Sequence, residues 1–128
     1  MNELQGLVHD CLVKSGHIEC AAIIKRGDGS ARATSVGYEV TSEQSSAITA
    51  AFASPTDAMK KGIKFNGASY KCIRADKDSI YAKKENSGFV ASLTKLYIVY
   101  GSYSSSMCPS ICVEIVEKVG DYFRAKGK

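Results

Sequence analysis

The stretch SIYAKKENSGFVASLTKLYIVYGSY, residues 79–103, decides the fold. Apolar, aromatic and β-branched residues fill three runs of it, and turn-forming residues separate these runs. The pattern predicts three consecutive strands, at Ser79–Lys84, Phe89–Leu93 and Leu96–Tyr103. Because the third run begins with an unbroken apolar segment, we expect its strand to be buried on both faces and to lie centrally in a sheet.

Two turns would join these strands into an antiparallel meander. The first is a cluster of turn formers, Glu85-Asn86-Ser87-Gly88. The second, near Thr94-Lys95, is short enough for a tight hairpin. Lys83 and Lys84 place positive charge beside the first turn. We therefore expect the meander to supply both the middle of the sheet and a binding edge.

The rest of the chain predicts strands that extend this sheet. Short apolar runs, bounded by turns rich in Gly, Asp and Asn, indicate four of them. They fall at Ile18–Lys25, Ala31–Val36, Ile63–Phe65 and Tyr70–Ala75. Gly27-Asp28-Gly29 is the turn between the first two, and Asn66-Gly67 is a hairpin dipeptide between the last two.

Three helices and a short helical turn are predicted to cover the sheet. Apolar residues at spacings of three and four predict an N-terminal helix, with Asn2 as its cap and Gly16 as its stop. Thr41–Gln44 fit a capping box that begins a second helix, and Asp57–Lys61 would form the helical turn. A C-terminal helix begins at Pro109. Its apolar stripe comprises Ile111, Cys112, Ile115, Val116, Val119, Tyr122 and Phe123.

This order of elements predicts an α+β fold in a single domain, residues 1–128. We expect a central antiparallel sheet, with the N- and C-terminal helices on one face and the shorter helices on the other. Hydrophobic residues make up 45% of the chain and charged residues 23%, which is ordinary for a soluble globular protein. The N-terminus lacks the pattern of a signal peptide, and no apolar run is long enough for a membrane span. Five cysteines without framework spacing predict reduced thiols in an intracellular protein.

Positive charge is concentrated in one window of the chain. Residues 60–84 hold eight basic and two acidic residues, a local net charge of +6, against +4 for the whole chain. Such an excess is typical either of a lysine-rich solvated surface or of a site for an anionic partner. No stacking or RNP-like signature accompanies the charge, so nucleic acid is the weakest of the candidate partners.

The histidines and cysteines do not form a catalytic or metal-binding pattern. His9 and His17 are not accompanied by a nucleophile elbow, a P-loop or a carboxylate pair. Cys108 and Cys112 form a helical i,i+4 pair without a second ligand pair, which argues against zinc. We therefore expect a binding protein that is not an enzyme and that uses neither a metal nor another cofactor.

Several segments, taken in order, are similar to one known family. They are Ala21–Ile24 with Gly27–Ser30, Cys72–Arg74, Lys83-Lys84 with Gly88, and Val116–Tyr122. Over its full length the chain resembles the profilins. Arg74–Asp76 and Tyr81–Asn86 most resemble the divergent fourth type of animal profilin. The resemblance implies a cytoplasmic, cytoskeletal monomer of the kind that binds actin monomers, proline-rich segments and phosphoinositides.

The resemblance implies an actin-binding site in this chain, and the chain differs from the family pattern at several positions of that site. The matching positions are Lys71, Ile73, Arg74, Lys83, Lys84, Gly88 and Thr94. Glu85 and Ser87 stand where the family has glycines, and Ser92 and Leu93 stand where it has a second basic pair. Because lost rim charges weaken association, we expect actin binding at least tenfold below that of a conventional profilin, about 1.4 kcal/mol. The alternative is a conventional sequestering profilin with its actin affinity retained.

The basic window predicts a site for acidic phospholipids and phosphoinositides, and peripheral membrane association. Its residues are Lys60, Lys61, Lys64, Arg74, Lys83 and Lys84. We expect binding through charge alone, because no lipidation motif or amphipathic anchor accompanies the cluster. Alternation along the strand predicts Lys83 and Lys84 on opposite faces, so the cluster would converge at one edge of the sheet.

The proline-rich site is predicted to be lost. Proline-rich segments dock on aromatic platforms. The resemblance places Glu3, Gly6 and Arg32 where profilins have a Trp, a Tyr and another Trp, and the chain contains no tryptophan. Tyr122 is the one ring expected nearby, and its spacing equally fits the helix stripe. We therefore expect proline-rich ligands to be unlikely partners.

Overall fold

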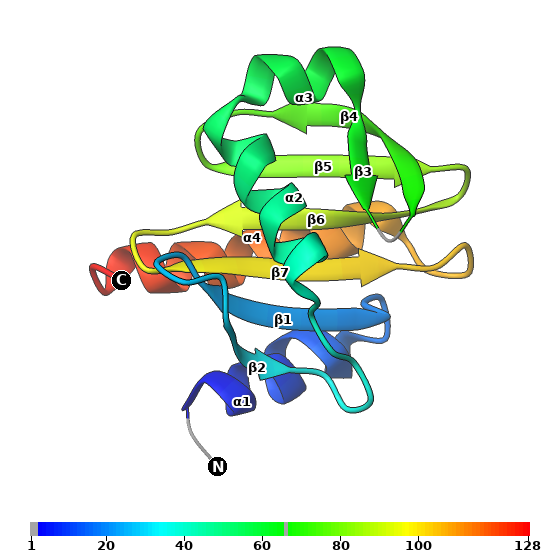
Figure 1. Cartoon of the computed structure of the whole chain (residues 1–128). Coiled ribbons are helices and arrows are strands. Elements are labelled where there is room, and N and C mark those ends of the chain that lie inside the picture. The colour runs from blue at the N-terminus through cyan, green and yellow to red at the C-terminus, as the bar shows by residue number, and fades with distance from the viewer. Residues whose placement is uncertain (1–2, 66) are drawn as a thin grey trace.

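The structure, a computed structural model, describes residues 3–65 and 67–128 (Figure 1). The predicted cap Asn2 and the turn residue Asn66 lie outside the described residues, as do the side chains of Glu3 and Phe65. One antiparallel sheet of seven strands runs through the molecule in the order β2-β1-β7-β6-β5-β4-β3. The strands are β1 (Cys20–Lys25), β2 (Ala31–Thr34), β3 (Ile63–Phe65), β4 (Ala68–Ala75), β5 (Ser79–Lys84), β6 (Ser87–Leu93) and β7 (Tyr97–Tyr103).

The meander occupies the middle of the sheet, as its sequence predicts. β7 lies between β1 and β6, and β6 lies between β7 and β5. The burial of β7 follows from this position, because both of its hydrogen-bonding edges and both of its faces are covered. Ile98 belongs to the core on one face and Val99 to the core on the other.

Helices cover both faces. The N-terminal segment begins as α1 (Glu3–Leu7) and continues through a π-helical turn, Val8–Leu12, and a 3₁₀ turn, Val13–Ser15. It lies beside α4 (Pro109–Ala125) on one face, and the other face carries α2 (Ser42–Ala53) and α3 (Pro55–Lys61) (Figure 1). The predicted α+β arrangement is confirmed.

The predicted helix signals also match the structure. Thr41 and Gln44 close both hydrogen bonds of a capping box at the start of α2. Gly16 adopts φ 80 after the 3₁₀ turn, a left-handed conformation that costs glycine little, and it ends the N-terminal segment. Pro109 is the first residue of α4. In the described part of the chain no helix is long and apolar enough to cross a membrane.

Several boundaries differ from the prediction, among them the start of β1, which is at Cys20 and not at Ile18. β6 begins at Ser87, two residues early, because Glu85 takes a left-handed φ of 56 and closes the hairpin with Asn86 alone. β2 ends at Thr34, and Val36, which was expected in that strand, is 87% exposed. β4 begins at Ala68 and α3 at Pro55, each two residues before the predicted start.

Two further apolar residues differ from their predicted placement. Leu96, expected in the central strand, lies in the β6–β7 turn with its side chain 43% exposed. The turn needs this third residue because the Thr94 backbone N–H donates to the Tyr97 carbonyl oxygen at 2.8 Å, which closes the loop around Leu96. Ile111, expected in the apolar stripe of α4, is 36% exposed at its first turn.

Candidate functional site

One side of β4 and β5 is left open beside α4. α4 packs mainly on β6 and β7 and contacts β5 at Ser79 and Tyr81, so the side chains of Lys71, Arg74 and Lys83 stay exposed. Lys71 of β4 is the direct cross-strand partner of Lys83 of β5, and Arg74 is the partner of Tyr81. Side chains at alternate positions share a face, so Lys83 lies on the same side as Tyr81. We call the exposed side chains of Lys71, Arg74 and Lys83 the open face.

A β-bulge shapes this surface. The register between β4 and β5 shifts between Cys72 and Arg74, so Ile73 is the extra residue. Ile73 is 51% exposed, whereas Cys72 is buried in the core under α2 and α3. The bulge thus presents one apolar side chain among cations. Of the predicted actin contacts, the structure brings Lys71, Arg74 and Lys83 together here, with Ile73 beside them.

The other predicted lipid residues lie elsewhere. Lys84 follows Lys83 in β5 and therefore points to the opposite face, as alternation predicts. Lys60 and Lys61 form the last turn of α3 on that same opposite side. Lys64 sits in the edge strand β3, opposite Ser69. All four are exposed. The basic window is thus divided between the two sides of the sheet and does not form one patch.

Gly88 and Thr94, also placed in the actin site by resemblance, are buried. A Cβ on Gly88 would lie 2.2 Å from the Ala82 carbonyl oxygen and 2.6 Å from the Tyr103 hydroxyl, so this glycine permits close packing of β6. Thr94 is 3% exposed. Its Oγ1 accepts the Tyr97 N–H at 3.0 Å and lies 3.1 Å from the Lys128 carbonyl oxygen, to which it donates. These two positions serve the hairpins and not the surface.

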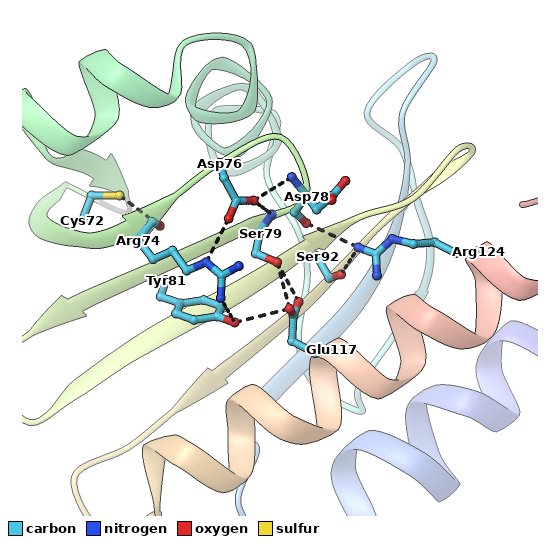
Figure 2. A network of polar contacts seen from close by, with 9 residues as sticks. All are labelled: Cys72, Arg74, Asp76, Asp78, Ser79, Tyr81, Ser92, Glu117 and Arg124. Carbon is cyan, nitrogen blue, oxygen red and sulfur yellow. Dashed lines mark hydrogen bonds and ion pairs between the residues drawn. The ribbon is translucent and has the colours of Figure 1, made fainter.

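A polar network joins the open face to α4 (Figure 2). The Glu117 carboxylate of α4 accepts the Ser79 hydroxyl at 2.8 and 3.0 Å and the Tyr81 hydroxyl at 3.3 Å. Seven residues further along α4, Arg124 donates to the Ser92 hydroxyl at 2.8 Å and to the Leu93 carbonyl at 2.9 Å. Since Ser79 and Ser92 are almost fully buried, the network satisfies polar groups under the helix and fixes it on β5 and β6.

Sequence reasoning missed this network. Glu117 and Arg124 are seven residues apart, which places them on one face of a helix. That spacing was available in the sequence. The two buried strand serines that they contact have no local signature, because the contacts join residues 32 to 38 positions apart.

Arg74 is tied to the network at the edge of the open face. Its Nε lies 2.9 Å from Asp76 Oδ2, and its Nη1 donates to the Tyr81 hydroxyl at 3.3 Å. The guanidinium carbon is 5.2 Å from the centre of the Tyr81 ring. The pKa of Tyr81 is raised, first by burial and then by the nearby Glu117 carboxylate. Tyr81 therefore stays a neutral hydroxyl that links the cation to α4.

A second surface lies between the N-terminal segment and α4. Leu7, Cys11, Ile115, Lys118, Val119 and Tyr122 line a groove of about 430 Å³. Tyr122 is the one aromatic residue among these described lining residues, and the Lys126 ammonium lies 4.6 Å from its ring centre. Gly6 is half-buried in α1, whereas Arg32 is exposed in β2 and lies 3.8 Å from Asp28.

The histidines and cysteines have structural partners or lie apart. His17 Nδ1 accepts the backbone N–H of Cys108 at 3.0 Å, and this bond ties the start of α4 to the N-terminal segment. The structure records five free thiols and, among the described residues, no group of three metal-ligating side chains. Burial raises the pKa of Cys112 to about 12, whereas a hydrogen bond from Ser110 and backbone N–H groups at the start of α4 lower the pKa of Cys108.

Comparison with known proteins fits this geometry. A family model described as Profilin matches residues 2–128. The chain belongs to the profilin family. It is similar to Profilin-4 of Bos taurus, with 41% identity over 99% of each chain, and to Profilin-2 of Acanthamoeba castellanii, with 35% identity over 96% of this chain and 97% of that one. The likeness to the fourth type of animal profilin, expected from the sequence, is confirmed.

Solved profilin structures superpose closely. Profilin II of Acanthamoeba castellanii has a TM-score of 0.89 and 34% identity, covering 98% of this chain and 100% of that chain. Mouse profilin IIa, in complex with a double repeat from the FH1 domain of mDia1, has a TM-score of 0.78 and 16% identity, covering 99% and 100%. That second likeness shows the fold alone. As a profilin, the chain belongs to a family of non-enzymatic, cytoskeleton-associated regulators of actin.

Proposed function

We propose that this profilin has kept the family's binding to anionic partners and has lost its binding to proline-rich segments. Acidic phospholipids and phosphoinositides are its main ligands, actin monomers bind weakly, and proline-rich segments do not bind. The observation that carries the lipid proposal is the open face, where Lys71 and Lys83 stand opposite each other with Arg74 close by. Like charges at directly opposed positions repel, and a bound phosphate relieves that repulsion.

The remaining lysines of the basic window lie away from this face. Lys60, Lys61 and Lys84 lie on the other side of the sheet and Lys64 on its edge strand, so they add to the general positive field. Each basic residue near an anionic surface contributes about 1 kcal/mol. Three engaged residues give weak, reversible, salt-sensitive membrane association without any inserted anchor.

The proposal of weakened actin binding rests on two departures from the family pattern. Glu85, at the tip of the β5–β6 turn, places a carboxylate beside Lys84. Ser92 stands where the resemblance puts a basic residue and is fully buried against α4, where it accepts a hydrogen bond from Arg124. Neither position can offer a cation to an acidic partner, which supports the tenfold loss.

The proposal of lost proline-rich binding rests on the groove beside α4. Docking of a polyproline II helix needs flat rings set side by side. Tyr122 supplies one ring, and the Lys126 ammonium lies over it. Gly6 and Arg32 supply no ring where the resemblance implies aromatic residues.

Parallel titrations test the proposal. We expect the protein to co-sediment with vesicles that contain acidic lipid and not with neutral vesicles, and about 0.5 M salt, where the Debye length is near 4–5 Å, should release it. Charge reversal on the open face, Lys71→Glu with Lys83→Glu, should abolish binding, whereas the matched pair Lys60→Glu with Lys61→Glu should only reduce it. Binding to neutral vesicles, or an equal effect of the two pairs, refutes the open face as the lipid site.

The second titration tests actin binding with the same protein. In a polymerisation assay with actin monomers we expect sequestration at least tenfold weaker than that of a conventional profilin measured alongside. Equal sequestration would support the alternative, a conventional profilin with retained actin affinity.

A further inference from the structure

The guanidinium of Arg74 is held by contacts with Asp76 and Tyr81 (Figure 2). Asp76 Oδ2 accepts from Nε at 2.9 Å, and the Tyr81 hydroxyl accepts from Nη1 at 3.3 Å. The same tyrosine ring lies under the cation, 5.2 Å from its central carbon. Arg74 therefore has a fixed orientation although its side chain is 53% exposed.

Asp76 is itself fixed by the β4–β5 turn. Its Oδ1 accepts the backbone N–H groups of Asp78 and Ser79, each at 2.8 Å. These bonds, with Asp78 first, and the nearby Arg74 lower the pKa of Asp76, so the carboxylate stays charged. On the other side, the Tyr81 hydroxyl donates to Glu117, which Ser79 also holds. We call the contacts of Asp76 and Tyr81 with Arg74 the clamp. Its two residues belong to the β4–β5 turn and to the start of β5.

These contacts restrict the hydrogen bonds that the Arg74 guanidinium can donate to a phosphate. A strong arginine–phosphate contact is bidentate and uses two parallel N–H groups on one edge of the guanidinium. The edge formed by Nε and Nη2 is occupied at Nε by Asp76, and one of the two N–H groups of Nη1 is used by the Tyr81 hydroxyl. The Nε/Nη2 edge therefore keeps only its Nη2 donor for a phosphate, and a phosphate at the Nη1/Nη2 edge must approach beside the bond to Tyr81.

We infer that Asp76 is a specificity-determining residue of the lipid site, one that keeps the Nε/Nη2 edge of Arg74 out of bidentate contact with phosphate monoesters. The inference rests on the proposed lipid function. The open face then attracts acidic membranes through its net charge and gains little from the terminal phosphates of a phosphoinositide head group. Releasing Arg74 should convert a charge-driven surface into one that prefers phosphate monoesters.

Asp76→Asn is the test. The amide keeps an oxygen for the N–H groups of Asp78 and Ser79 but replaces the oxygen that accepts from Arg74. Asp78→Asn is the matched control, because it removes the same charge from the same turn, and the recorded bonds of Asp78 are made by its backbone. The probes are phosphatidylcholine vesicles containing either phosphatidylinositol bisphosphate or phosphatidylserine, at equal total lipid charge.

We expect Asp76→Asn to bind the bisphosphate vesicles about threefold to fivefold more tightly than Asp78→Asn does, the scale of a surface ion pair. The two variants should bind phosphatidylserine vesicles alike. Adding Arg74→Ala should remove the gain. Tyr81→Phe, which keeps the ring and releases Nη1, provides a second variant and should shift the preference the same way.

The outcomes separate the two proposals. If the wild-type protein binds both acidic vesicles while Asp76→Asn and Asp78→Asn behave alike on each, the clamp is refuted and the lipid function stands. If none of the proteins binds either acidic vesicle, both are refuted. A gain for Asp76→Asn that persists in the Arg74→Ala background also refutes the clamp, because the effect would then not pass through Arg74.

Discussion

Lys71 and Lys83 are direct cross-strand partners on β4 and β5, and both are exposed. Two like charges in this relationship destabilise a sheet, whereas opposite charges stabilise it, by about 0.2–1 kcal/mol. The fold itself does not need the pair, since the buried apolar side chains of the two strands, Cys72, Ile80 and Ala82, lie on the other face. A cost to stability at an exposed position is expected where the surface serves a ligand.

Lys83→Glu should therefore separate stability from function. The change gives Lys71 an opposite charge, so we expect the free energy of unfolding to rise by about 0.5 kcal/mol in a urea titration. Binding to acidic vesicles should fall in the same variant. Lys84→Glu is the control, because its partner across the hairpin is Ser87 and no cation stands opposite. A loss of stability in Lys83→Glu equal to that in Lys84→Glu would contradict the register argument.

Gly120 tests the contact between α4 and the sheet. A Cβ at this helical position would lie 2.3 Å from the Ser92 hydroxyl oxygen, which is buried and bonded to Arg124. We expect Gly120→Ala to destabilise the protein by about 1–3 kcal/mol, the usual effect of overpacking. Gly6→Ala, in α1, is the matched control, since nothing lies within 4 Å of its added Cβ. There the helix preference of alanine should be neutral or favourable, so equal losses would refute the close approach.

The sequence predicted what depends on local pattern. Strand alternation, the capping box at Thr41 and the stop at Gly16 act over a few residues, and each is present in the structure. Contacts between distant segments could not be read in this way. The burial of Thr94 depends on the Lys128 carbonyl, 34 residues away, and the anchoring of α4 depends on Ser92, 32 residues from Arg124. The sequence thus predicted which residues belong to the candidate site, but it did not predict how they are arranged in space.

The groove beside α4 gives a prediction of restored binding. The wild-type protein should pass through a polyproline column at physiological salt, where a conventional profilin is retained. Replacing Gly6 by Tyr and Arg32 by Trp restores rings at the positions that the family resemblance implies, and adding Lys126→Ala uncovers Tyr122. We expect the triple variant to be retarded on the column. Retention of the wild-type protein would show that one ring suffices and would overturn the proposed loss.

The thiols should differ in reactivity along α4. Thiolate is the reactive form, so the lowered pKa of Cys108 favours alkylation and the raised pKa of Cys112, about 12, opposes it. With iodoacetamide near pH 7.5 we expect Cys108 to be modified early, whereas Cys112 and the buried Cys72 react after unfolding in urea. Mass spectrometry of the digested protein identifies each site. Labelling of Cys112 in the folded protein at the rate of Cys108 would contradict its burial.

Glu85 combines a strained backbone with an unfavourable charge, and two substitutions separate these effects. Its φ of 56 lies in the left-handed region, which costs a residue with a Cβ about 1–2 kcal/mol relative to the right-handed one. Glu85→Gly should relieve this strain and remove the carboxylate beside Lys84, whereas Glu85→Gln removes the charge alone. We expect both variants to bind actin monomers and acidic vesicles more tightly, and we expect only Glu85→Gly to raise the urea midpoint. If Glu85→Gln leaves both affinities unchanged, the carboxylate does not weaken binding, and the proposed loss of actin affinity must then lie at Ser92 and Leu93.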